Sequence, residues 1–138
     1  ASFPHKEVTH LKVPFTLGAV WHFGLAVRDP RASARWFMRV SGLTKQFEYE
    51  GGVGIGNANT LIVFSKGKPS PKTIGHVAFH LPTMTALKKA LAHLKKLKVQ
   101  VEDPGHEIGP VAPGSKSVGI WFSDPDGYRW ELAVQSKK

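Results

Sequence analysis

Two copies of one strand-like phrase constrain the fold of this chain more than any other feature. The first copy reads His22-Phe-Gly-Leu-Ala-Val-Arg-Asp-Pro30, and the second reads His76-Val-Ala-Phe-His-Leu-Pro-Thr83. Each copy begins with a histidine, alternates as a half-buried strand does, and runs into a helical pattern. An internal repeat of this length predicts two similar structural units.

The residues after each copy predict the same order of elements. Asp29-Pro30 is a helix start and Gly42 a helix stop, and strands are expected at 44–50, 51–57 and 60–65. The second unit has a strand at 75–81, a helix capped by Thr83, and strands near 98–103, 117–123 and 128–134. The turn Asp124-Pro-Asp-Gly127 predicts a hairpin between the last two strands.

The predicted fold is therefore α+β, with two βαβββ modules. We assign residues 1–18 to an N-terminal arm, 19–66 to the first module, 67–73 to a linker and 74–135 to the second module. A glycine- and proline-rich loop at 104–115 interrupts the second module. Long loops in compact domains are often lids or binding loops, so we expect this loop to border a site and to be mobile.

Composition limits the kinds of binding partner and chemistry that the chain can have. The formal net charge is +9, and much of the excess lies on one predicted helix that carries Lys88, Lys89, Lys95 and Lys96. Aromatic residues are not interleaved with these lysines, so we expect a solvated surface and no nucleic-acid partner. The sequence has no cysteine, which excludes disulfides, thiolate ligands and a cysteine nucleophile.

Two histidines and one glutamate fit a divalent-metal site. On the predicted strands, His22, His76 and Glu131 each point away from the large apolar neighbours. They share their faces with small residues, which leave room for a cavity. A lone strand histidine is usually structural, but three concordant positions favour a metal site.

The same phrases resemble the vicinal oxygen chelate superfamily, which includes glyoxalase I, extradiol dioxygenases, fosfomycin-modifying enzymes and bleomycin-resistance proteins. The resemblance covers roughly residues 20–135, and its most specific part is the ending from Phe122 to Leu132, with Asp124-Pro-Asp-Gly127 inside it. It implies two modules curled around a metal cleft, and it puts His22, His76 and Glu131 at ligand positions. A fourth family ligand would fall near Ile62 or Val63, neither of which binds metal, so the chain resembles the three-ligand members.

Two imidazoles and a carboxylate favour Fe(II) or Mn(II), with Zn, Ni or Co as alternatives. Three protein ligands leave positions for a small substrate that binds through two adjacent oxygens. The resemblance implies a dioxygenase-like enzyme. The alternatives are a glyoxalase-type lyase or isomerase, a fosfomycin-type thiol transferase, and a metal-free protein that sequesters a small molecule.

Three further residues are candidates for catalysis. His80 shares the face of His76 about 13 Å along the strand, His106 lies in the loop, and Tyr128 follows the hairpin turn. The alternative for His80 is that it only lines the cleft. The alternative for His106 is that it is an exposed loop residue without a role. Tyr49 and Tyr128 are both potential donors to a bound oxyanion.

We expect a small-molecule substrate and a homodimer as the partners, since modules in this superfamily pair within one chain or across two. No apolar run is long enough to cross a bilayer, so we expect no membrane partner. A cytoplasmic location follows as an expectation, with export after signal-peptide removal as its alternative.

Overall fold

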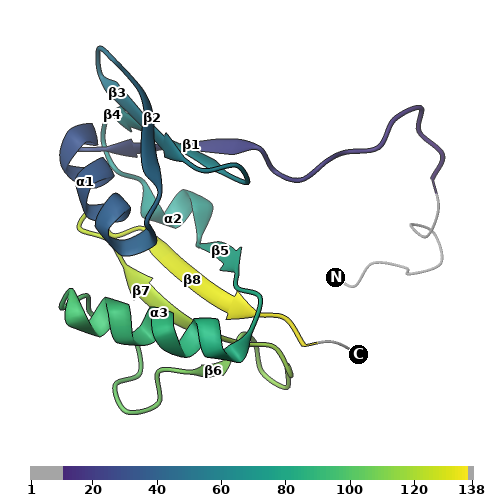
Figure 1. Ribbon diagram of the computed structural model, residues 1–138. Coiled ribbons are helices and arrows are strands. Elements are labelled where there is room, and N and C mark those ends of the chain that lie inside the picture. Colours follow the sequence, from purple (N-terminus) through teal and green to yellow (C-terminus); the bar gives the residue numbers. More distant parts are fainter. Residues whose placement is uncertain (1–10, 137–138) are drawn as a thin grey trace.

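Two four-stranded sheets form the protein in the computed structural model, which describes residues 11–136 (Figure 1). Sheet A has the order β1-β4-β3-β2, with β1 (His22–Val27), β2 (Thr44–Tyr49), β3 (Gly52–Gly56) and β4 (Leu61–Lys66). Sheet B has the order β5-β8-β7-β6, with β5 (Val77–His80), β6 (Gly109–Pro110), β7 (Val118–Ser123) and β8 (Arg129–Val134). In each sheet the first strand pairs in parallel with the last, so the predicted α+β fold of two related units is confirmed.

Helix boundaries follow the capping signals in the sequence. Helix α1 (Pro30–Ser41) begins after Asp29, whose side chain accepts a hydrogen bond from the Ala32 N–H at 3.1 Å, and ends at Gly42 with φ of 76°. Helix α3 (Met84–Lys96) is capped in the same way by Thr83. A short helix, α2 (Pro71–Ile74), lies in the segment that was expected to be only a linker.

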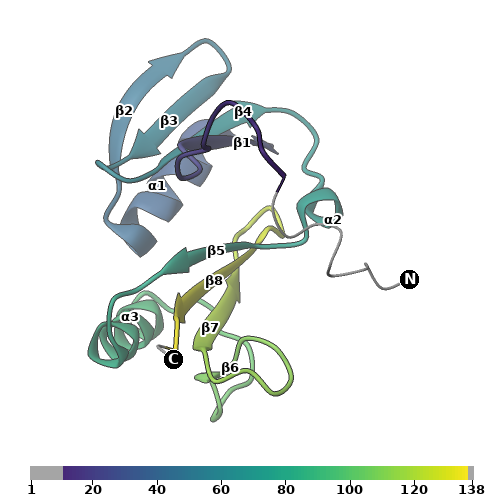
Figure 2. The ribbon, with the colours of Figure 1, turned by 90° about the vertical axis from the view of Figure 1, so that its right-hand side faces the viewer.

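The core lies between the sheets and is centred on α1. The ring of Phe37 lies 6.3 Å from that of Phe64 in sheet A, and 4.4 Å from that of Trp130 in sheet B. Figure 2 shows α1 between the two sheets. The apolar side chains of β1, β4, β8 and β7 face this core, so the other face of each sheet points away from it. We call that face the open face of sheet A or of sheet B.

One predicted strand is wrong. Residues 98–103 form no regular strand, and only Val101 makes an isolated bridge to Phe122. Lys98 and Asp103 both have a positive φ, of 60° and 55°, so the backbone leaves the extended conformation at each end of this segment. The edge of sheet B is formed instead by β6, two residues long.

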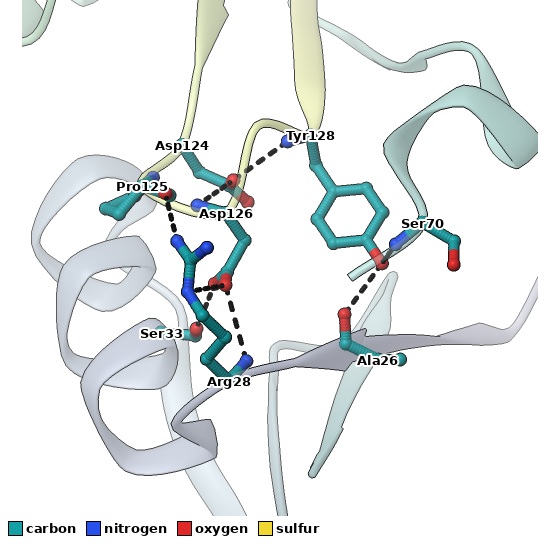
Figure 3. Close-up of polar contacts among 8 residues, drawn as sticks. All are labelled: Ala26, Arg28, Ser33, Ser70, Asp124, Pro125, Asp126 and Tyr128. Carbon is teal, nitrogen blue, oxygen red and sulfur yellow. Dashed lines mark hydrogen bonds and ion pairs between the residues drawn. The ribbon is translucent and has the colours of Figure 1, made fainter. Parts of the chain in front are cut away.

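The turn Asp124–Gly127 joins the two halves of the molecule (Figure 3). The carboxylate of Asp126 accepts hydrogen bonds from the Arg28 N–H at 3.3 Å and from the Ser33 hydroxyl at 3.0 Å. The Arg28 guanidinium pairs with the same carboxylate at 3.2 Å and donates to the Pro125 carbonyl at 2.7 Å. The predicted hairpin turn is therefore confirmed, and it also holds the end of β1 and the start of α1 against sheet B.

The segment before β1 carries large apolar side chains that are exposed. Leu11, Val13, Phe15 and Leu17 are between 60% and 82% exposed, and Figure 1 shows the segment extending away from the sheets. Residues 1–10 of the predicted arm lie outside the described part of the chain. Within residues 11–136, no helix has the length and apolar character that crossing a membrane requires.

Candidate metal centre

His76 and Glu131 lie together on the open face of sheet B. The His76 Nε2 and the Glu131 Oε1 are 3.8 Å apart. Glu131 is the partner of Ala78 in the parallel β5–β8 pair, and His76 immediately precedes β5. The predicted strand repeat therefore brings two of the three candidate ligands to one place.

Glu131 is a buried carboxylate with few partners. It is 4% exposed, and its charged neighbours are His76 and Arg129. Among the described residues, none makes a hydrogen bond to its oxygens. Burial raises the pKa of this carboxyl, and the positive charges of a protonated His76 and of Arg129 oppose that rise. A cation beside it would compensate for the lost hydration.

Glycine makes room beside this carboxylate. A Cβ atom added at Gly119 on β7 would lie 3.1 Å from the Glu131 Oε2 and 2.8 Å from the Leu132 carbonyl oxygen. Any larger residue at this position would therefore push the carboxylate or the strand. The sequence reading did not identify Gly119.

Trp121 and Arg129 support His76. The Trp121 ring meets the His76 ring edge to face, with centroids 4.9 Å apart, and the Arg129 Cζ lies 3.9 Å from the Trp121 ring centroid. Glu102 holds Arg129 through two hydrogen bonds of 2.8 Å and 2.7 Å. The sequence reading missed these three residues, although strand alternation places Trp121 and Arg129 on the face of Glu131.

His22 lies on the open face of sheet A and is exposed. Its ring contacts that of Trp21, with centroids 4.5 Å apart. The counterpart of Glu131 in sheet A is Val63, which pairs with Gly24 as Glu131 pairs with Ala78. Sheet A therefore offers one candidate ligand and sheet B two.

Within one chain, the described residues include no group of three His, Asp or Glu side chains that could hold one ion. The open faces of the two sheets point in opposite directions, so His22 does not join His76 and Glu131. The resemblance left open whether the cleft forms within one chain or between two, and the described residues of one chain do not bring the three predicted ligands together. The convergence of all three residues stays a prediction for an assembly of chains.

The chemistry of the donor set fits a divalent ion. A buried carboxylate without hydrogen bonds in the described structure lies beside an imidazole that is half exposed. One more imidazole would complete two nitrogens and one oxygen, which suits first-row transition metals. His76 and Glu131 would thus provide two of the three ligands of such a site.

His106 and His80 border this region from two sides. His106 lines a cavity of about 480 Å³ together with Trp121, Glu107 and Ile108. His80 is exposed at the end of β5, opposite Ala133. Since Trp121 contacts His76, the cavity at His106 adjoins the candidate metal ligands, whereas His80 lies further along the strand.

Tyr128, one of the residues predicted to be catalytic, lies at the contact between the two halves of the molecule. This residue is 3% exposed, and its hydroxyl donates to the Ala26 carbonyl at 2.6 Å and accepts from the Ser70 N–H at 3.1 Å. Both bonds are seen in Figure 3, where the ring spans from the turn to β1. Its hydroxyl is thus engaged in joining the sheets rather than facing an open site. Tyr49 likewise has a partner, the Ser65 hydroxyl at 3.1 Å.

Comparison with known proteins gives a family match over most of the chain. Residues 19–132 match the family model described as Glyoxalase/Bleomycin resistance protein/Dioxygenase superfamily. A search of curated protein sequences returns no match.

Solved structures share the fold at low sequence identity. A genomically encoded fosfomycin resistance protein, FosX, from Listeria monocytogenes is 17% identical, with a TM-score of 0.71 over 88% of this chain and 96% of that one. Lactoylglutathione lyase from Agrobacterium tumefaciens is 17% identical, with a TM-score of 0.68 over 86% and 94%. A glyoxalase/bleomycin resistance protein/dioxygenase from Nocardioides is 16% identical, with a TM-score of 0.69 over 96% and 90%. These likenesses establish the fold alone.

Proposed function

Because this chain belongs to the glyoxalase, bleomycin resistance protein and dioxygenase superfamily, we propose that it is a divalent-metal-dependent enzyme. Its substrate is a small molecule that binds the ion through two adjacent oxygens, and its reaction is dioxygenase-like. Fe(II) or Mn(II) is the preferred ion. The observation that carries the proposal is the buried, weakly partnered Glu131 beside His76 on the open face of sheet B.

The proposed site is shared between two copies of the chain. The open faces point away from each other in one chain, so one copy supplies His76 and Glu131 and the other supplies His22. A two-fold axis then creates two equivalent sites. Exposed apolar side chains on the arm and just before β1, such as Phe15 and Trp21, support a partner surface on this side of the molecule.

A bound ion supplies Lewis-acid chemistry and a template for two substrate oxygens. The residues around it then have separate tasks. Trp121 and Arg129 fix the His76 ring, and His106 lies in the adjoining cavity, where it can exchange a proton with a bound molecule. His80 lies farther along β5 and is assigned to lining the approach to the site.

Metal analysis of the full chain tests this proposal. Protein purified without added metal or chelator should retain about one Fe, Mn or related ion per chain. Glu131→Gln and His76→Ala should each lower the metal content and the affinity measured by calorimetry. Glu50→Gln, which changes an exposed turn carboxylate, is the matched control and should bind like the parent.

Ligand binding with and without chelator separates an enzyme from a sequestering protein. An enzyme of the proposed type loses affinity for a two-oxygen ligand, and loses turnover, when a chelator is added. If the ligand affinity is unchanged both by the chelator and by Glu131→Gln, and no turnover is found, the protein is a metal-free binder.

A further inference from the structure

The open face of sheet A has a floor of glycine. Gly52 and Gly54 on β3 are buried, and they lie in rows of paired residues that begin at Tyr49 and Phe47 on β2. A Cβ atom added at Gly52 would lie 2.1 Å from the Tyr49 ring, and one added at Gly54 would lie 2.4 Å from the Phe47 ring. The two rings therefore lie over the backbone of β3, in the space that larger side chains would fill.

These rings form one aromatic surface, which we call the Phe47–Tyr49 shelf. Their planes are 26° apart and their centroids are 6.2 Å apart. The Tyr49 hydroxyl is fixed by Ser65 on β4 at 3.1 Å. The side chains are nevertheless 40% and 49% exposed. A fixed but exposed pair of rings is preorganised to bind another flat group.

The shelf lies on the same face as His22. Two neighbouring rows cross the sheet, one with Gly24, Val63, Gly54 and Phe47, and the next with Ala26, Ser65, Gly52 and Tyr49. His22 begins the adjacent row, with Leu61 and Gly56. Two strand spacings, or about 10 Å, separate β1 from the strand that the rings cover. A small molecule held at His22 can therefore reach the shelf.

The surface between His22 and the shelf is uncharged. Gly24, Ala26, Val63 and Ser65 form it. The charges of β2 lie elsewhere, since Glu48 pairs with Arg31 and Lys45. An apolar flat group is therefore favoured over a charged one at this place.

We infer that Phe47 and Tyr49 are specificity-determining residues that bind a flat aromatic ring of the substrate. The inference rests on the proposed function, and it narrows the substrate class to molecules with an aromatic ring beside their two adjacent oxygens. Trp121 on sheet B is a second aromatic side chain at the proposed site.

Two hydroxamates that bind metals through the same two oxygens provide the test. Acetohydroxamate lacks a ring and 2-naphthohydroxamate carries one. With the Co(II)-loaded parent, calorimetry should give about tenfold tighter binding of the naphthyl compound. In Phe47→Ala/Tyr49→Ala this preference should disappear, while the affinity for acetohydroxamate stays unchanged.

Two variants sharpen the result. Gly54→Ala keeps both rings but forces the Phe47 ring off β3, and it should also reduce the preference. Met84→Ala, which removes an exposed apolar side chain at the start of α3, should keep it. The inference is overturned if the preference survives the double substitution, or if the double variant loses dimerisation by size-exclusion chromatography and affinity for both hydroxamates together.

A metal-independent measurement separates the two proposals. If the protein retains no metal and neither hydroxamate binds, the proposed function fails, but 2-naphthol should still shift the amide resonances of Gly52 and Gly54 by NMR. If the metal binds and the two hydroxamates bind equally, the shelf inference fails and the proposed function stands. Unshifted glycine amides also contradict the inference.

Discussion

Glu131 and Tyr128 are both buried on or beside β8, but they differ in whether their polar atoms make hydrogen bonds. The Tyr128 hydroxyl has a donor and an acceptor partner from two other segments. The Glu131 carboxylate has no hydrogen bond among the described residues. Among the described residues no fully enclosed side-chain oxygen or nitrogen lacks a partner, so the unbonded Glu131 oxygens remain open to solvent or to a ligand. This contrast favours a stabilising role for Tyr128 and a ligand role for Glu131, and both roles stay predictions.

Replacing Tyr128 tests that assignment. Tyr128→Phe keeps the ring but leaves the Ala26 carbonyl and the Ser70 N–H without this partner, so the free energy of unfolding should fall by about 1–3 kcal/mol. Urea denaturation measures it. Metal content, and turnover once a substrate is known, should stay at the parent level well below the melting temperature. A variant of parental stability with lost turnover would return Tyr128 to catalysis.

Trp121 provides a second test at the level of single residues. Because its ring holds the His76 imidazole, Trp121→Leu should weaken metal binding about tenfold without unfolding the protein. Trp121→Phe retains an aromatic edge contact and should recover part of that affinity. Calorimetry with Co(II) gives both values, and equal affinities in all three proteins would exclude a positioning role.

Among the elements, the loop after residue 103 is more firmly attached than its composition suggests. The Glu107 side chain accepts from the Gly105 N–H at 3.0 Å and pairs with the Lys95 Nζ on α3 at 3.1 Å. Gly109 and Pro110 pair with β7 as β6. The expected mobility of 104–115 stays a prediction, and these contacts limit it to the residues between the anchors.

The anchor at Glu107 has a defined pH dependence. The Gly105 and Glu107 N–H groups and the Lys95 ammonium lower the pKa of Glu107 from 4.5 to about 2. A lowered carboxyl pKa stabilises the folded state above the unfolded value of 4.5, and that contribution is lost as the pH falls toward 2. The parent should therefore melt at a higher temperature than Glu107→Gln at pH 6, and the difference should shrink below pH 4.5 and vanish only below about pH 2. Thermal melts at low salt measure it, and a constant difference would contradict the anchor.

Sequence alone predicted most elements because their signals are local. Asp29, Gly42 and Thr83 mark helix ends through contacts a few residues away, and alternation placed His22 and Glu131 on the correct faces. The prediction of a strand at 98–103 was wrong because two non-glycine residues in this segment adopt a positive φ. Composition does not reveal such a conformation. The sequence also did not predict the Phe47–Tyr49 shelf or the Trp121–His76 contact, because both depend on strand register rather than on any single phrase.

The arrangement of the whole molecule decides where a site can form. Phe37 of α1 packs against both sheets, and Arg28 and Tyr128 fasten them together. The faces that carry the candidate ligands are consequently turned outward. The fold thus joins its two halves back to back, and among the described residues a site made of His22, His76 and Glu131 would need a second copy of the chain.

Mixing two inactive variants distinguishes a shared site from a single-chain one. His22→Ala and His76→Ala should each lose the metal as homodimers. In a mixed dimer, the His76→Ala copy supplies His22 and the His22→Ala copy supplies His76 and Glu131, so one of two sites is intact. Random exchange of equal amounts makes half of the dimers mixed, and about a quarter of all sites should then bind Co(II).

Titration with Co(II) after co-refolding measures this fraction. The control is a mixture of His76→Ala with Glu131→Gln, whose changes fall on the same half-site, and it should recover no sites. Absence of recovery in the first mixture, with mixed dimers present, would show that the ligands are not shared between copies.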